Sequence, residues 1–196
     1  MYADWLRRAL DYPYNIPCTS YVYSSGAYRK LDGDVQLDRL NKRYPVLALG
    51  SNMSPNQLAR KFSDAAIGAI PVTRVRLLDF DSVYSSQIAA YGAIPATLYH
   101  SPGTEVVLFI TWLNERQLER MHQTELTNNA YQFCILKGIS SFIERGPKIN
   151  ELFFYRASVG ALSINDMPVP LETVMASNRN WTAKSQHRIQ SYLKNK

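Results

Sequence analysis

The segment VLALGSNMSPNQLARKF, residues 46–62, places four apolar residues directly before Gly-Ser-Asn and a polar stretch. The apolar run 46–49 has the composition of a short buried strand. Ser54 followed by Pro55 is typical of a helix N-cap with proline at the first helical position, so we expect a helix as far as about Phe62. The residues between them form a strand-to-helix turn, whose free N–H groups can bind an anion or a developing oxyanion.

Further strands and helices alternate irregularly along the rest of the chain. Because the alternation is too irregular for a doubly wound parallel sheet, the sequence predicts an α+β fold with a mixed, curled β-sheet or small barrel and a few short helices. Strands are predicted at 72–80, 82–88, 93–100, 105–113, 131–136 and 152–156, and helices at 115–124 and 182–193.

Residues 1–44 differ from the remainder, because they hold more than half of the 13 tyrosines and show little periodicity. We expect a short helix at 4–10, another helical turn at 34–42, and an N-terminal extension that packs on a core formed by residues 45–196. A chain of 196 residues is long enough for one substantial core.

Charge and composition argue against several classes of partner. The net charge is +6, yet the basic residues form no run longer than a pair, so nucleic-acid binding is not expected. Cys18 and Cys134 are far apart, without a CxxC pattern or a histidine cluster, so neither a metal site nor a disulfide framework is predicted. No apolar stretch approaches 18 residues, which favours a cytoplasmic protein over a membrane protein.

The end of the chain carries one arginine beside a tryptophan. Such a pair can hold an anionic ligand or a partner surface. We expect instead that Trp181 docks the last helix against the core and that Arg179 lies in solvent.

Two segments taken together resemble the γ-glutamylcyclotransferase-like superfamily: LALGSNMSPNQLARKF and the later GAIPATLYHSPGTEVVLFITWLNERQLERMHQTELTNNAYQFCIL. The resemblance covers roughly residues 45–156, in the order that the family shows. Leu49 and Leu126 stand where the family has a tyrosine and a glycine, and residues 1–44 have no counterpart in its small members. The matching residues are Gly50, Ser51 and Asn52 in the loop, Gly92, Pro95, Ala96 and Thr97 next, then Pro102 and Gly103 in a turn, Glu125 and Tyr131.

The resemblance implies an enzyme that cyclises a γ-glutamyl amide into 5-oxoproline and a free amine. Glu125 would act as the general acid/base, because the attacking α-amine must lose a proton. The turn from Leu49 to Met53 would supply N–H donors, and a residue such as Tyr84 or Tyr91 would have to provide, from another strand, the hydroxyl that Leu49 lacks. No metal or cofactor is implied, since the substrate carries its own nucleophile. The predicted substrate-binding residues are Leu49, Gly50, Ser51, Asn52, Met53, Tyr84 and Tyr131.

Two other functions are compatible with the same residues. The scaffold could be a non-catalytic module that binds a small carboxylate-bearing ligand. It could also be an interaction protein that uses its tyrosine-rich N-terminal arm, because tyrosine is enriched at recognition surfaces. Glu125 itself could be a solvated surface carboxylate, as most glutamates are. The expected partner is a small-molecule γ-glutamyl substrate, with its amine portion and the oligomeric state left open.

Overall fold

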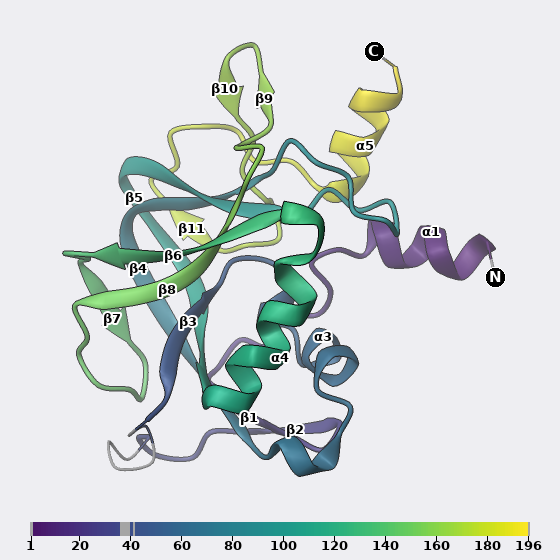
Figure 1. Ribbon diagram of the computed structural model, residues 1–196. Helices are drawn as coiled ribbons and strands as arrows, with labels where there is room; N and C mark the ends of the chain where they lie inside the picture. Colours follow the sequence, from purple (N-terminus) through teal and green to yellow (C-terminus); the bar gives the residue numbers. More distant parts are fainter. Residues whose placement is uncertain (1, 36–39, 41, 196) are drawn as a thin grey trace.

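The computed structural model describes residues 2–35, 40 and 42–195, so most of the helical turn expected at 34–42 lies outside the described residues. Its elements form an α+β fold with helices on an extended, curled sheet (Figure 1). The helices are α1 (Tyr2–Leu10), α3 (Pro55–Lys61), α4 (Glu115–Glu125) and α5 (Gln186–Lys194). The strands are β1 (Tyr21–Ser24), β2 (Ala27–Lys30), β3 (Tyr44–Ala48), β4 (Ile70–Tyr84), β5 (Ala96–Leu113), β6 (Tyr131–Lys137), β7 (Ser141–Ile143), β8 (Glu151–Ala157), β9 (Ser163–Ile164), β10 (Met167–Pro168) and β11 (Ala176–Ser177).

The long antiparallel pair β4–β5 runs through the middle of the sheet. Each strand was expected as two, but each is continuous across a bulge at which the register shifts between Leu78 and Phe80. Asp79 and Gly103 both adopt positive φ there, and the Gly103 N–H donates to the Asp79 carboxylate at 2.7 Å. The Pro-Gly turn expected at 102–103 is therefore a bulge inside β5, which bends the strand without ending it.

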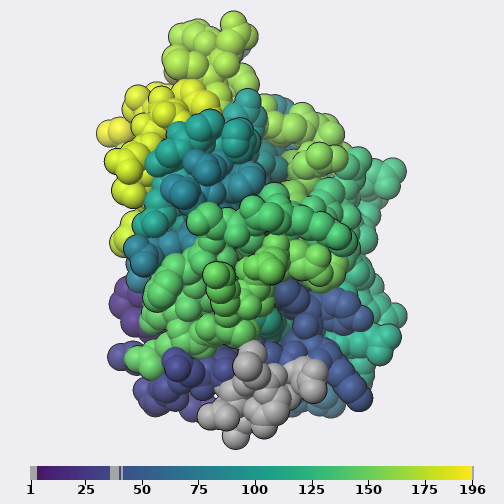
Figure 2. All heavy atoms as spheres, turned by 90° about the vertical axis from the view of Figure 1, so that its left-hand side faces the viewer, coloured from purple at the N-terminus to yellow at the C-terminus, as the bar shows by residue number. Residues whose placement is uncertain are grey.

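The described strands of the large sheet follow the order β2-β1-β4-β5-β3-β8-β6, with β11 on β5 and β7 on β4. β3 and β8 are parallel, whereas the other pairs are antiparallel. The prediction of an α+β fold with a mixed, curled sheet is thus confirmed. The sheet stays open, because its end strands β2 and β6 pair with other strands and not with each other. The small hairpin β9–β10 projects from the body of the molecule (Figures 1 and 2).

Helix α4 packs one face on the core and exposes the other. Leu118 and Met121 are buried, while Glu115 and Glu119 are exposed. Asn114 forms a reciprocal capping box with Gln117, which fixes where the helix begins. The helix therefore starts directly after β5 and runs back across the sheet to place its last residue near the end of β3 (Figure 1).

The N-terminal residues are part of the sheet as well as a cover over it. β1 pairs with the start of β4, where Tyr21 lies opposite Val72 and Tyr23 opposite Ile70. Both tyrosines are buried, and their hydroxyls donate to the carbonyls of Met53 and Phe62 at 3.0 Å. These two bonds attach the N-terminal strand to the segment that carries the Gly-Ser-Asn turn.

The expectation that Arg179 lies in solvent is wrong. Its guanidinium pairs with Asp81 at 2.9 Å, and the side chains of Arg179 and Asp81 are 16% and 0% exposed. The same guanidinium donates to the carbonyls of Leu171 and Val174. Burial raises the pKa of Asp81, and the hydrogen bond and charge of Arg179 oppose that rise. A carboxylate buried to this degree needs a cation, and the C-terminal segment supplies it.

We expect Arg179→Met to reduce the free energy of unfolding by about 3 kcal/mol, because it leaves the Asp81 carboxylate buried without a cation. Urea denaturation followed by circular dichroism measures the change. Arg188→Met is the control: its pair with Glu172 spans 3.7 Å on the surface, so its loss costs less than about 1 kcal/mol. Equal effects of the two substitutions would contradict the structural role of Arg179.

Candidate active site

The Gly-Ser-Asn turn directly follows the end of β3 at Ala48. The Leu49 carbonyl accepts a hydrogen bond of 2.6 Å from the Ser82 hydroxyl, which anchors the chain as it leaves the sheet. Ser51–Met53 forms one 3₁₀ turn, in which the Met53 N–H donates to the Gly50 carbonyl at 3.0 Å. Helix α3 then begins at Pro55. The predicted strand-turn-helix arrangement is therefore present, and the turn spans very few residues.

Glu125, the last residue of α4, lies beside this turn. Its Oε1 accepts a hydrogen bond from the Asn52 side-chain amide at 2.9 Å and forms an ion pair with the Lys61 ammonium. The side chains of Lys61 and Glu125 are only 8% and 14% exposed, so Glu125 is not a solvated surface carboxylate. Among the described residues, no hydrogen bond reaches Oε2. One oxygen thus orients the carboxylate, and the other is free to accept a proton.

Three tyrosines surround this carboxylate. Burial, followed by the charge of Glu125, raises the pKa of both Tyr131 and Tyr155. Burial raises the pKa of Tyr12 well above its usual range, with smaller contributions from Tyr131 and Glu125. All three phenols therefore keep their protons at neutral pH. Glu125 is thus surrounded by neutral hydroxyl groups, two of which are held in place: Tyr131 donates to the Ala96 carbonyl, and Tyr155 pairs with His122.

The Tyr12 hydroxyl lies directly against the turn. It accepts a hydrogen bond from the Ala96 N–H at 2.8 Å, and the backbone of Ser51 lies beside the same oxygen. A Cβ atom added to Gly50 would lie 2.0 Å from this hydroxyl oxygen and 3.0 Å from the Ala96 Cβ. The close approach of this hydroxyl is therefore one reason why glycine occupies the position.

These groups line a pocket of about 640 Å³ between the turn, the end of α4 and the N-terminal segment. Glu125 is the only acidic residue among the described residues that line it, whereas Arg8, Arg60 and Lys61 are basic. No cysteine or histidine lies among those lining residues, and the described residues hold no cluster of three potential metal-ligating side chains. The pocket can therefore bind an anion and transfer a proton through Glu125.

The structure brings six of the predicted site residues together and leaves two outside. The Met53 side chain is buried in the core, and its N–H is already bonded to Gly50. The Tyr84 hydroxyl donates to the Lys184 carbonyl at 3.0 Å, on the side of the C-terminal segment. Neither residue lines the pocket, and the hydroxyl next to the turn comes from Tyr12. The residues that do line it are Leu49, Gly50, Ser51, Asn52, Glu125 and Tyr131.

Three residues of the site were missed by sequence reasoning. Lys61 carried a usable signal, because it lies three residues after Leu58 and therefore shares the buried face of α3. Tyr12 lies 84 positions before Ala96, and no local pattern joins them. Tyr155 is on β8, where it was assigned only as a strand residue.

Leu126, which stands where the family has a glycine, does not strain the chain. Its φ is −87°, a conformation open to any residue, and its side chain is 36% exposed. Positive φ values occur at Asn128 and Asn129, for which asparagine is well suited. The turn after Glu125 therefore tolerates a leucine at this position.

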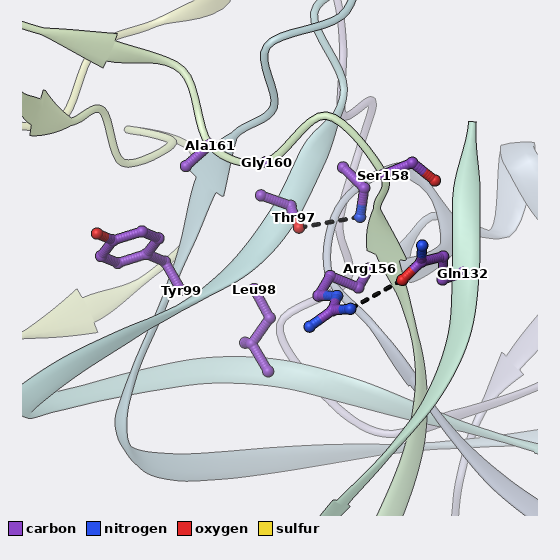
Figure 3. Close-up of a pocket in the computed structure, with 9 residues that line it drawn as sticks. Thr97, Leu98, Tyr99, Gln132, Arg156, Ser158, Gly160 and Ala161 are labelled. Carbon is purple, nitrogen blue, oxygen red and sulfur yellow. Dashed lines mark hydrogen bonds between the residues drawn. The ribbon is translucent and has the colours of Figure 1, made fainter. Parts of the chain in front are cut away.

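A second pocket of about 310 Å³ lies between β5 and β8 (Figure 3). The Thr97 hydroxyl accepts a hydrogen bond from the Ala157 N–H at 3.2 Å, and Arg156 donates to Gln132 at 2.8 Å. These contacts satisfy the polar groups across the strands. The Thr97 and Arg156 side chains thus serve contacts between strands, and no carboxylate of the described residues lines this pocket. The pocket at Glu125 is therefore the stronger candidate site.

None of the described helices is long and apolar enough to span a membrane. No protein-family model matches the chain, and no curated protein matches it in sequence.

Solved structures with a similar fold include one described as a gamma-glutamyl cyclotransferase, at 16% identity and a TM-score of 0.48, covering 79% of this chain and 99% of its own. Two others are Arabidopsis thaliana proteins with solution structures. One is 14% identical, with a TM-score of 0.42 and coverage of 79% and 85%; the other is 12% identical, with a TM-score of 0.40 and coverage of 85% and 81%. These likenesses concern the fold alone.

The contact between Gly50 and Tyr12 can be tested by a double-mutant cycle. We expect Gly50→Ala to reduce the free energy of unfolding by about 1–3 kcal/mol, because the new methyl group overlaps the phenol oxygen. In a Tyr12→Phe background the same substitution should cost less, since the oxygen at 2.0 Å is gone and the next atoms lie at 3.0 Å. Chemical denaturation of the four proteins measures the coupling, and strictly additive effects would argue against the contact.

The pairing of Tyr155 with His122 predicts a pH dependence. The Tyr155 hydroxyl lies 2.8 Å from His122 Nδ1, and burial lowers the pKa of His122 below 6.5. The neutral imidazole is thus favoured in the folded protein, and its contribution is present above pH 6.5 and lost as the pH falls through the folded pKa. We expect His122→Gln to reduce the loss of stability between about pH 7 and pH 5. The exposed His187→Gln is the control, and urea denaturation at both pH values is the measurement; unchanged pH dependence in His122→Gln would contradict the assignment.

Proposed function

We propose that the protein cyclises a γ-glutamyl amide, releasing 5-oxoproline and a free amine. One observation carries the proposal: Asn52 and Lys61 hold the Glu125 carboxylate through Oε1, while Oε2 receives no hydrogen bond from the described residues. A carboxylate fixed in this way is suited to take a proton from a ligand in the pocket. The order of sequence motifs from the Gly-Ser-Asn turn to Glu125 supports the same chemistry.

The reaction needs a base and no other reactant. The α-ammonium group of the substrate gives a proton to Glu125, and the resulting amine attacks the γ-carbonyl carbon to form the new C–N bond. The original amide C–N bond then breaks, and Glu125 returns the proton to the leaving nitrogen. Atoms balance without water, a metal or a cofactor, because nucleophile and leaving group belong to one molecule. Holding the two ends of the substrate together supplies part of the rate increase.

The groups around Glu125 have distinct tasks under this proposal. Asn52 and Lys61 orient the carboxylate, so that the free oxygen faces the substrate amine. The Tyr131 hydroxyl donates to the Ala96 carbonyl at 3.4 Å, so its oxygen is an acceptor for the α-ammonium group of the substrate. The basic side chains that line the pocket favour a ligand with negative charge, which the α-carboxylate of a γ-glutamyl group provides.

We expect Glu125→Gln to lower the rate of 5-oxoproline release by at least about 100-fold, because the amide has nearly the same shape but cannot accept the proton. Product release is measured by chromatography over a panel of γ-glutamyl dipeptides and γ-glutamyl amines. Glu119→Gln is the matched control, since it removes the same charge from an exposed position of the same helix.

Wild-type release that persists in Glu125→Gln would show that Glu125 is not the base. A folded wild-type protein that releases no 5-oxoproline from any member of the panel would count against the whole reaction. Binding of the same compounds without turnover would then favour the non-catalytic carboxylate-binding module.

A further inference from the structure

The Tyr12 hydroxyl occupies the position at which the turn could hold an oxygen atom of a ligand. The Ala96 N–H donates to this oxygen at 2.8 Å, and the backbone of Ser51, from a different segment, lies beside it. Gly50 leaves the space that the oxygen fills, because a single added carbon would overlap it. The arrangement is a compact oxygen-binding subsite. It is occupied by the hydroxyl of Tyr12, which lies outside the core predicted at residues 45–196.

Aromatic and cation–π contacts hold the segment that carries Tyr12. The ring of Tyr14 contacts that of Tyr12 edge-on at 6.1 Å, and the Arg60 guanidinium lies 4.6 Å from the centre of the Tyr14 ring. The guanidinium of Arg8, on α1, lies 4.4 Å from the centre of the Tyr91 ring. Among the described residues, no carboxylate pairs with Arg8 or Arg60, and the buried Arg8 Nε makes no hydrogen bond. The segment is thus seated in a pocket that is also lined by two arginines, neither of which pairs with a carboxylate in the described part of the chain.

A carboxylate ligand would compete with the phenol for this subsite. Backbone N–H groups bind an anionic oxygen more strongly than a neutral one. An incoming carboxylate would also enter a pocket whose described lining holds the basic residues Arg8, Arg60 and Lys61 and one carboxylate, that of Glu125, whereas the phenol carries no charge. Both differences favour the ligand once the phenol has moved.

We propose that the N-terminal segment is autoinhibitory: the Tyr12 hydroxyl blocks the oxygen subsite formed by Ser51 and Ala96, and a carboxylate ligand binds when Tyr12 withdraws. The inference rests on the proposed function only for the identity of the ligand, since the blocked subsite is defined by the backbone of Ser51 and Ala96. Tyr12 is thereby a regulator of access to the site and takes no part in the proton transfer at Glu125.

The test compares the wild type with Tyr12→Phe, which keeps the ring and removes only the blocking oxygen. Isothermal titration calorimetry measures binding of two carboxylates, 5-oxoproline and glutarate. We expect at least one of them to bind about tenfold more tightly to Tyr12→Phe, because the ring loses the hydrogen bond that seats it against the turn and withdraws more readily. Tyr28→Phe, at an exposed tyrosine of the same N-terminal region, should bind like the wild type.

A second measurement uses the unmodified protein. The N–H groups of Asp11 and Tyr14 donate to the carbonyls of Arg7 and Asp11, so their exchange with deuterium reports whether the segment stays seated. Saturating carboxylate should speed this exchange and leave that of β4 and β5 unchanged. Exchange at these N–H groups that becomes slower with ligand, or that does not change, would overturn the proposal.

Turnover separates this inference from the proposed function. Suppose that Tyr12→Phe binds carboxylate more tightly and that neither protein releases 5-oxoproline. This result would support autoinhibition by Tyr12 and would contradict the proposed cyclisation. Release by the wild type with weaker or equal binding in Tyr12→Phe would retain the reaction and overturn autoinhibition. Failure of both carboxylates to bind either protein would also overturn it, because a side chain that is held less firmly should give way to them.

Discussion

The pairing of β4 with β5 is the interaction on which the other parts of the structure depend. β4 also holds β1 and β7, and β5 also holds β3 and β11, so most of the sheet is attached to these two strands. The bulge at Asp79 and Gly103 lets both strands continue while the sheet curls. If this pair did not form, β3 would lose its neighbour on one side, and the turn that follows it would have no fixed position.

The site follows from two short connections to that pair. β3 lies against β5 and ends in the Gly-Ser-Asn turn, and α4 leaves the end of β5 and returns to place Glu125 beside the turn. A carboxylate that is mostly removed from solvent requires hydrogen bonds or a cation, and Asn52 and Lys61 provide both. The geometry of the turn and the position of the acid are thus fixed by the same packing.

Local patterns in the sequence were sufficient for the α+β class, the strand-turn-helix at 46–62 and the helix that ends at Glu125. They failed where a contact joins distant positions: Tyr12 reaches Ala96 across 84 residues, and Arg179 reaches Asp81 across 98. A buried arginine in particular has no local signature, because only its partner distinguishes it from a surface one. The continuity of β4 and β5 was missed for another reason, since Gly103 reads as a turn unless its strand partner is known.

The attachment of β1 to the start of β4 has a consequence for how the N-terminal region can be studied. β1 covers the hydrogen-bonding edge of β4 at 70–72, and an uncovered edge of this kind is a template for pairing with another chain. A protein shortened by its first forty residues would therefore lose Tyr12 and, at the same time, expose an unpaired edge of β4 that favours aggregation. Self-association of such a fragment would result from the exposed edge of β4 and would say nothing about the pocket. Single-residue substitutions change the pocket and leave the sheet intact.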